Sequence, residues 1–70
     1  MTAITQANVG ETYQIKWVIP DHKTESIYEA IKIEAGRSIT LLHRYLDYIV
    51  VRYCGHVYAM SSDVAYRIKV

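Results

Sequence analysis

The last sixteen residues, GHVYAMSSDVAYRIKV, change their pattern twice and constrain the fold more than any other stretch. An apolar run from Val57 to Met60 is interrupted by three polar residues, Ser61-Ser62-Asp63, and a strict alternation then runs from Tyr66 to Val70. Side chains of serine and aspartate bond nearby backbone donors, which favours a turn or the start of a helix. The pattern therefore predicts a strand, a single helical turn and a closing strand.

Size and composition indicate one small globular domain. The chain has 70 residues, 51% of them hydrophobic, and a net charge of +1. Such a composition is neither disordered nor collagenous. The eight basic and seven acidic residues are interspersed, so no basic stripe is available to bind a nucleic-acid backbone.

Cysteine usage and the first residues bear on the compartment. The single cysteine, Cys54, cannot form an internal disulfide, and a lone thiol fits a reducing compartment. The start MTAITQANVGET lacks the basic and apolar regions of a signal peptide. No apolar run approaches the roughly 18 residues that suggest a membrane span. We expect a cytoplasmic protein without direct membrane insertion.

The N-terminal third predicts a loose lead-in and a strand. Residues 1–7 are small and polar, and we expect a flexible segment before a folded domain over 8–70. Residues 8–11, with Asn8 and Gly10, are typical of a turn. The stretch TYQIKWVI alternates with a period of two, which predicts a strand with Tyr13, Ile15, Trp17 and Ile19 on its inward face. Pro20 ends it.

The next segment changes to helical spacing. Ile27, Ala30 and Ile31 recur as on a helix face, and Ser26 with Glu29 matches a capping box, although Asp21 or Thr24 could cap equally well. We expect a short helix over roughly 24–32. Ala35-Gly36 forms the turn out of it.

The remainder predicts several short strands with tight connections. RSITLLHR and YIVVRY flank the short link YLD and are expected to pair as a hairpin, and Cys54-Gly55 is a second turn or a bulge before HVYAM. Closing such a sheet removes edges that would otherwise aggregate. We therefore expect a mainly β fold: a small SH3-like barrel of about five strands. One short helix lies between the first two strands, and a helical turn precedes the last.

The order of these elements resembles the FeoA family, the small cytosolic partner of bacterial ferrous iron uptake. Its opening turn and strand correspond to VGETYQIKWV, and its helix and next strand to SIYEAIKIEAGRSITLLHR. Its hairpin, helical turn and closing strand correspond to YIVVRYCGHVYAMSSDVAYRIKV, so the resemblance covers residues 8–70. The chain departs from the family pattern at Tyr45-Leu46-Asp47, where the family has Pro-Gly-Gly.

The resemblance implies a non-enzymatic accessory protein that acts by contact with the cytosolic part of the transmembrane GTPase FeoB, the ferrous iron transporter. A metal-dependent regulatory module, like the FeoA-like domains attached to metal-responsive repressors, is the alternative. A small barrel that binds nucleic acid is a third reading. Weak homo-oligomers are compatible with each of them.

Metal-ligating and catalytic patterns are sparse, so we expect no cofactor, no metal and no enzymatic activity. The soft ligands are His22, His43, Cys54 and His56, and only Cys54 and His56 are close in sequence, without a paired zinc-site spacing. Ser61, Ser62, His43 and Asp63 could be assembled into a triad, but no Gly-flanked nucleophile supports one.

The seven tyrosines divide between core and surface. Tyr13, Tyr58 and Tyr66 lie on predicted inward faces. The helix residue Tyr28 and the hairpin residues Tyr45 and Tyr48 have no evident core role. Together with Arg44 and the neighbouring His43 they predict a partner-binding patch, because tyrosine and arginine are common interface anchors. The alternative is that these rings shield a thin barrel.

Overall fold

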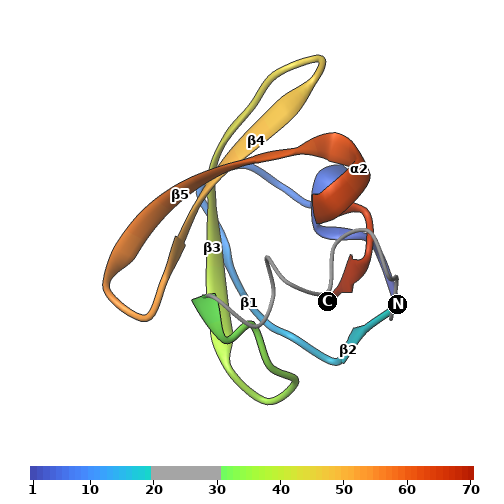
Figure 1. Cartoon of the computed structure of the whole chain (residues 1–70), viewed down its shortest axis with the longest axis vertical. Coiled ribbons are helices and arrows are strands. Elements are labelled where there is room, and N and C mark those ends of the chain that lie inside the picture. The colour runs from blue at the N-terminus through green and yellow to red at the C-terminus, as the bar shows by residue number, and fades with distance from the viewer. Residues whose placement is uncertain (20–30) are drawn as a thin grey trace.

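A computed structural model describes residues 1–19 and 31–70 (Figure 1). Most of the described elements are short strands, in agreement with the predicted mainly β fold. In chain order they are η1 (Ile4–Gln6), β1 (Thr12–Gln14), β2 (Trp17–Val18), β3 (Ser38–Arg44), β4 (Tyr48–Tyr53), β5 (His56–Ser61), α2 (Ser62–Ala65) and β6 (Ile68–Lys69).

The strands form two small antiparallel sheets that share one stretch of chain. One sheet has the order β1-β3-β4-β5, and the other pairs β2 with β6. β1 and β2 are successive parts of the alternating stretch, and the chain changes partner between them: Ile15 N–H donates to Arg37 C=O at 2.8 Å, and Lys16 N–H donates to Lys69 C=O at 2.8 Å. The first strand therefore belongs to both sheets.

This change of partner makes the prediction of an inward Trp17 wrong. Ile15 is buried as expected, but Lys16 is exposed and Trp17 is 49% exposed. Alternation of side chains holds only along a regular strand. The bend at Ile15 and Lys16 breaks that regularity and turns the indole toward solvent.

The two predicted turns around β4 are confirmed. β3 and β4 pair antiparallel with a register shift between Leu41 and His43, and Tyr45-Leu46-Asp47 connects them. β4 and β5 pair without a shift from Tyr48↔Ser61 to Tyr53↔His56. Cys54 and Gly55 have φ values of 50° and 80°. Positive φ at both central residues is the signature of the type I′ turn of two-residue hairpins.

The polar triplet near the C-terminus forms the predicted helical turn. Ser61 caps α2 and its side chain accepts a hydrogen bond from Val64 N–H at 3.4 Å. Ile68 and Val70 are buried, as the alternation predicts. The prediction of an inward Tyr66 is wrong, because this residue is the helical C-cap of α2, with φ −55°, and is 53% exposed. Its ring lies 3.8 Å from Lys69 Nζ.

The prediction of a flexible lead-in over residues 1–7 is also wrong. Ile4 of η1 is fully buried, and Ala3 and Ala7 are buried beside it. The backbones of Thr2 and Val70 exchange hydrogen bonds of 3.0 and 2.8 Å. The apolar side chain of Ile4 fills the core beneath α2, so this segment is part of the fold.

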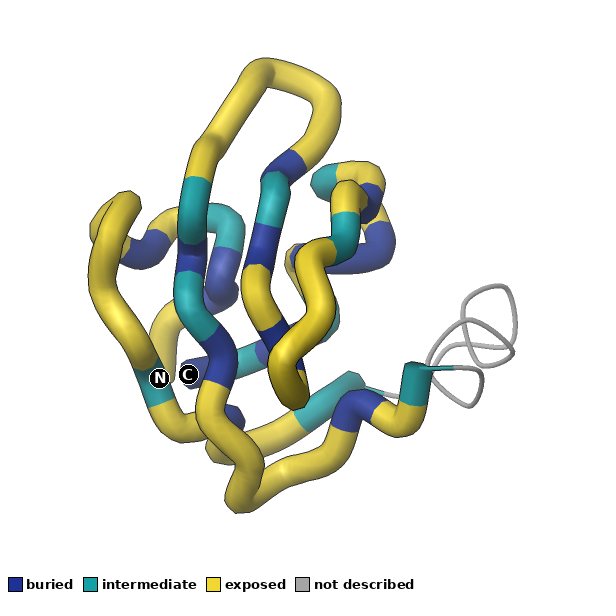
Figure 2. Tube along the Cα trace, turned by 90° about the vertical axis from the view of Figure 1, so that its left-hand side faces the viewer, coloured by how far each residue is buried: buried dark blue, intermediate teal, exposed yellow. Residues whose placement is uncertain are grey.

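The core is formed by buried residues from both sheets together with α2 and η1. In Figure 2 the buried stretches, in dark blue, recur along many segments of the chain. Tyr13 and Tyr58 are half-buried and pack against it, close to expectation. The largest fully buried side chains are Tyr53, Ile4, Ile15, Ile39, Leu41, Ile49, Ile68 and Val51.

The remaining predictions concern the segment before β3. Gly36 has φ 92°, so the turn predicted at Ala35-Gly36 is confirmed. The helix predicted over roughly 24–32 lies outside the described residues except at its last two positions. Tyr28 and His22 lie outside them as well.

Candidate protein-contact surface at the β3–β4 hairpin

The connection between β3 and β4 projects from the body of the molecule and is exposed throughout. We call residues 44–48 the hairpin tip. Leu46 is 96% exposed, Tyr45 49% and Tyr48 41%. Figure 2 shows an exposed stretch at the top of the molecule, and in sequence the buried Ile49 follows the tip. Large apolar groups thus face solvent where a turn normally places small polar residues.

The aromatic rings of the hairpin tip are in contact with one another. The Tyr45 and Tyr48 rings stack with centroids 4.7 Å apart and an interplanar angle of 20°. The His43 ring follows at 6.1 Å from the Tyr45 ring. Stacked rings lose less conformational freedom on binding than isolated long side chains, so they are suitable contact groups.

Hydrogen bonds fix the backbone of the hairpin tip. Tyr45 N–H donates to Tyr48 C=O at 2.9 Å, which closes the turn. From the start of α2, Ser62 N–H donates to Asp47 C=O at 2.9 Å, and Ser62 Oγ donates to Leu46 C=O at 3.5 Å. The exposed side chains therefore stand on a backbone held from two elements.

Arg44, predicted as part of a partner-binding patch, also bonds within the fold. Its Nη1 donates to the backbone carbonyls of Ala7 at 2.5 Å and of Thr5 at 3.5 Å. These bonds connect the end of β3 to the N-terminal segment. Nothing in the sequence indicated this structural role, and the side chain remains exposed.

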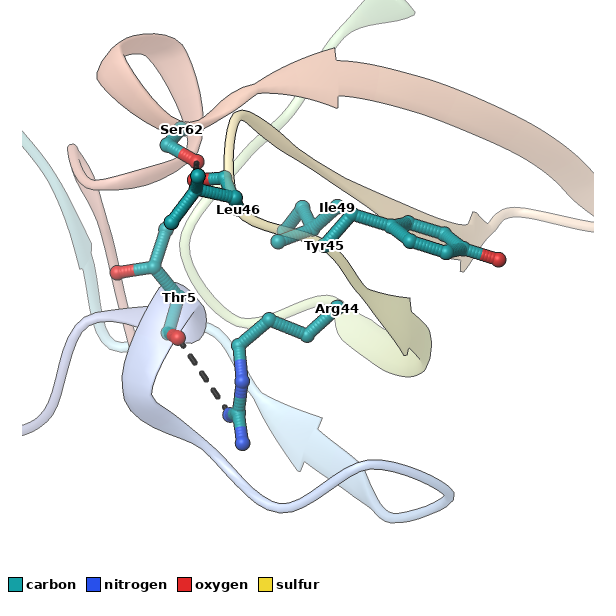
Figure 3. A pocket seen from close by; sticks show the side chains of 6 residues that line it. All are labelled: Thr5, Arg44, Tyr45, Leu46, Ile49 and Ser62. Carbon is teal, nitrogen blue, oxygen red and sulfur yellow. Dashed lines mark hydrogen bonds between the residues drawn. The ribbon is translucent and has the colours of Figure 1, made fainter.

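A pocket of about 470 Å³ opens between the hairpin tip, η1 and α2 (Figure 3). The Tyr45 ring points away from Thr5 and Ser62, toward the outside of the pocket. The lining residues are Thr5, Arg44, Tyr45, Leu46, Ile49 and Ser62. Leu46, Thr5 and Ser62 were not predicted from the sequence as site residues. Leu46 could have been identified from the sequence, because a leucine is unusual inside a three-residue turn that faces solvent.

The weak metal candidates Cys54 and His56 lie at the other end of β4. Both are exposed, and the His56 ring lies 6.2 Å from the Tyr58 ring. They line a separate pocket of about 280 Å³ that Glu34 also borders. Within residues 1–19 and 31–70, no three side chains of the His, Cys, Asp and Glu types are grouped to hold a metal ion.

The serines near α2 act as caps and braces. Ser61 Oγ accepts from Val64 N–H, and Ser62 Oγ donates to Leu46 C=O. Both hydroxyls therefore bond to the backbone.

Tyr53 is a polar group that the sequence did not single out. Its side chain is buried, and its hydroxyl donates to Lys32 C=O at 2.6 Å and accepts from Glu34 N–H at 3.1 Å. Burial raises the pKa of the Tyr53 phenol from its ordinary value of 10.0; the hydrogen bond with the Glu34 backbone opposes this rise, and the nearby Cys54 and Glu34 add to it. This hydroxyl holds the segment before β3 against β4.

Comparison with known proteins gives matches in structure and none in sequence. No family model matches the chain, and no curated protein matches it. The crystal structure of an iron uptake regulatory protein, FeoA, superimposes with a TM-score of 0.79 over 96% of this chain and 89% of that one, at 15% identity. The chain has the FeoA-like fold. The SH3-like barrel expected from the sequence is therefore confirmed.

Two further structures share the FeoA-like fold. The solution structure of a FeoA-like protein from Clostridium acetobutylicum has a TM-score of 0.82 and 16% identity, covering 96% of this chain and 80% of that one. A manganese-dependent transcriptional repressor has a TM-score of 0.84 and 17% identity, covering 94% of this chain and 38% of the repressor. The fold thus occurs both as most of a small protein and as one part of a regulator.

Among residues 1–19 and 31–70, no helix is long and apolar enough to cross a membrane.

Proposed function

We propose that this FeoA-like chain is a non-enzymatic accessory protein of the cytoplasm. It acts by contact with the cytosolic part of a FeoB-type GTPase and ferrous iron transporter. The observation that carries the proposal is the hairpin tip, where stacked tyrosines and a 96% exposed leucine stand on a hydrogen-bonded backbone. The near-complete coverage of a FeoA and of a FeoA-like protein supports the same assignment.

The chemistry of the hairpin tip suits binding. It offers ring faces and an aliphatic side chain, and its one guanidinium already bonds to backbone carbonyls. Interface energy is concentrated in a few aromatic and apolar anchors surrounded by neutral contacts. Tyr45, Leu46 and Tyr48 are the anchors in this proposal, and Arg44 positions them.

Such a domain changes the activity of a GTPase only if it binds one conformational state better than another. A net charge of +1 gives little long-range attraction to any partner. Affinity then rests on the buried contact area, and the preformed tip avoids the entropy of ordering a loop.

A metal-dependent regulatory module is the second candidate, favoured by the TM-score of 0.84 with the manganese-dependent repressor. In that reading the domain works beside a DNA-binding part, since it spans 38% of the repressor chain.

Calorimetry separates the two candidates. The chain is titrated with the purified cytosolic part of a FeoB-type GTPase and, separately, with Mn²⁺. We expect saturable heat with the GTPase and no change of melting temperature with the metal. Saturable Mn²⁺ binding together with no heat from the GTPase would favour the regulatory module.

A further inference from the structure

β5 is an edge strand of the four-stranded sheet. Within the part of the chain that the structure describes, β4 lies on one side of it and no strand lies on the other. Figure 1 shows the β4–β5 hairpin extending away from the body of the molecule, with β5 on its outer side. An edge strand presents backbone donors and acceptors to which another strand can pair.

The register identifies which backbone groups point outward. In an antiparallel ladder, residues point their N–H and C=O alternately toward and away from the neighbouring strand. His56 closes the Cys54-Gly55 turn opposite Tyr53, so its N–H and C=O groups point toward β4, as do those of Tyr58 and Met60. The N–H and C=O groups of Val57 and Ala59 therefore point away from β4, in the plane of the sheet. No turn, loop or cap bond among the described residues uses their backbone groups.

This edge lacks the features that usually prevent pairing. Natural edges carry lysine, proline, an inward charge or a bulge. The six residues of β5, HVYAMS, include no lysine, no proline and no acidic residue, and their pairing with β4 has no register shift. Val57 is 57% exposed and Ala59 is exposed. Among residues 1–19 and 31–70, this edge is regular, largely apolar and unpaired.

We propose that β5 pairs antiparallel with β5 of a second copy, across a two-fold axis at Tyr58. Val57 of each copy then exchanges backbone hydrogen bonds with Ala59 of the other. The product is a homodimer in which the two four-stranded sheets are continuous. This proposal goes beyond the proposed function and does not rest on it.

Charge and side-chain pairing identify the occupant as a second copy. A strand without Lys, Arg, Asp or Glu pairs with itself without placing these charges opposite one another, and in this register His56 lies opposite Met60. On the outer face Val57 lies opposite Ala59, so apolar groups meet; on the inner face the half-buried Tyr58 meets its own copy. A two-fold antiparallel pair is isologous and closes after two copies.

The outer face strengthens the same arrangement. Next to the edge, Val50 of β4 is half-buried and lies opposite Ala59, so Val50 and Ala59 form a short apolar row that ends at the edge. In the dimer this row is extended by Val57 of the other copy, which lies opposite Ala59 and is followed on that copy's β4 by Arg52. The hairpin tip ends at Tyr48, at the far end of β4 from the Cys54-Gly55 turn, and remains accessible in the dimer.

Sedimentation equilibrium over a wide range of concentration tests the proposal. Wild type is expected to show a monomer–dimer equilibrium. Ala59→Lys should weaken dimerisation at least about tenfold, because it places a charged side chain opposite Val57 of the other copy and two like charges at diagonal positions across the axis. Leu46→Lys is the matched control, since it adds the same charge at the hairpin tip and should leave dimerisation unchanged.

Amide hydrogen exchange on wild type supplies a measurement that needs no variant. Exchange of the Val57 and Ala59 amides should slow as concentration rises, because these amides become bonded in the dimer. A wild-type chain that stays monomeric, exchange at Val57 and Ala59 that is independent of concentration, or dimerisation lost in Leu46→Lys and kept in Ala59→Lys would each overturn the proposal.

Discussion

The two turns at the ends of β4 differ in what holds them and in what they expose. Cys54 and Gly55 turn the chain by adopting positive φ, and local backbone geometry accounts for that turn completely. The hairpin tip instead depends on Ser62 and Arg44, which bond it to α2 and to the N-terminal segment. It also exposes two tyrosines and a leucine to solvent. The Cys54-Gly55 turn is thus set by its own backbone, whereas the hairpin tip is held by tertiary contacts and presents large side chains outward.

The largest effect is expected from removing the support beneath the hairpin tip. Ile4 is fully buried in the N-terminal segment to which Arg44 bonds. Ile4→Ala should lower the free energy of unfolding by about 2–5 kcal/mol, through lost burial and the cavity that remains. Urea unfolding measures this free energy. The control is Val9→Ala, at an exposed position, and its free energy of unfolding should stay within about 0.5 kcal/mol of the wild-type value. Equal stability of both variants would mean that the segment is not part of the core.

The next effect concerns Tyr53, which holds the segment before β3. Tyr53→Phe leaves Lys32 C=O and Glu34 N–H without the hydroxyl and should cost about 1–2 kcal/mol. Tyr13→Phe, which removes a hydroxyl bonded to exposed groups, should cost less. A larger loss in Tyr13→Phe would contradict this ranking.

Tyr53 also predicts a dependence of stability on pH. Its pKa is raised in the folded state by burial, so the folded chain resists ionisation of the phenol. As the pH rises, the phenol of the unfolded chain ionises before that of the folded chain. The free energy of unfolding is therefore unaffected at pH values below the ordinary pKa of 10.0 and decreases as the pH rises above it. Denaturant unfolding at alkaline pH should show a smaller decline in Tyr53→Phe than in wild type. The same decline in both would assign the effect to other groups.

Substitutions in the two turns sharpen the comparison directly. Gly55→Ala should cost about 1 kcal/mol, because an L residue at φ 80° is strained even though space for the Cβ is open. Leu46→Ser should change the free energy of unfolding by less than about 0.5 kcal/mol, since the side chain is 96% exposed. If Leu46→Ser proves the more destabilising of the two in thermal unfolding, the tip has a folding role.

No effect on stability is expected from a chelator. Cys54 and His56 are exposed, and the fold is held by packing of apolar side chains. The melting temperature should be the same with and without EDTA. A shift of several degrees would point to a structural metal.

Sequence patterns anticipated the parts of the fold that depend on local chemistry. The turn at Cys54-Gly55, the cap at Ser61 and the buried Ile68 follow from short motifs whose geometry is set by neighbouring residues. Where one stretch serves two sheets, periodicity failed, because Trp17 takes a position that its distant partner Lys69 decides. At Tyr66 it failed for a local reason, because the helical turn of α2 extends to this residue as its C-cap.

The candidate site was predicted in part for the same reason. Exposure of Tyr45 and Tyr48 followed from their place in a hairpin turn. The engagement of Arg44 with Ala7 joins residues far apart in the chain, and the small polar residues 1–7 gave no periodic signal of a buried Ile4. Such contacts depend on tertiary packing and are not visible in local patterns.

The central claim is that the exposed side chains of Tyr45, Leu46 and Tyr48 bind a partner and are dispensable for folding. The most direct test makes two measurements on the variant Tyr45→Ala: its calorimetric affinity for the cytosolic part of a FeoB-type GTPase and the melting temperature of the free chain. The control is Tyr66→Ala, because Tyr66 is a similarly exposed tyrosine at the C-cap of α2. Tyr45→Ala should weaken binding by about 1 kcal/mol or more with little change in melting temperature, and Tyr66→Ala should bind like wild type. Wild-type affinity in Tyr45→Ala, or its unfolding, would contradict the claim.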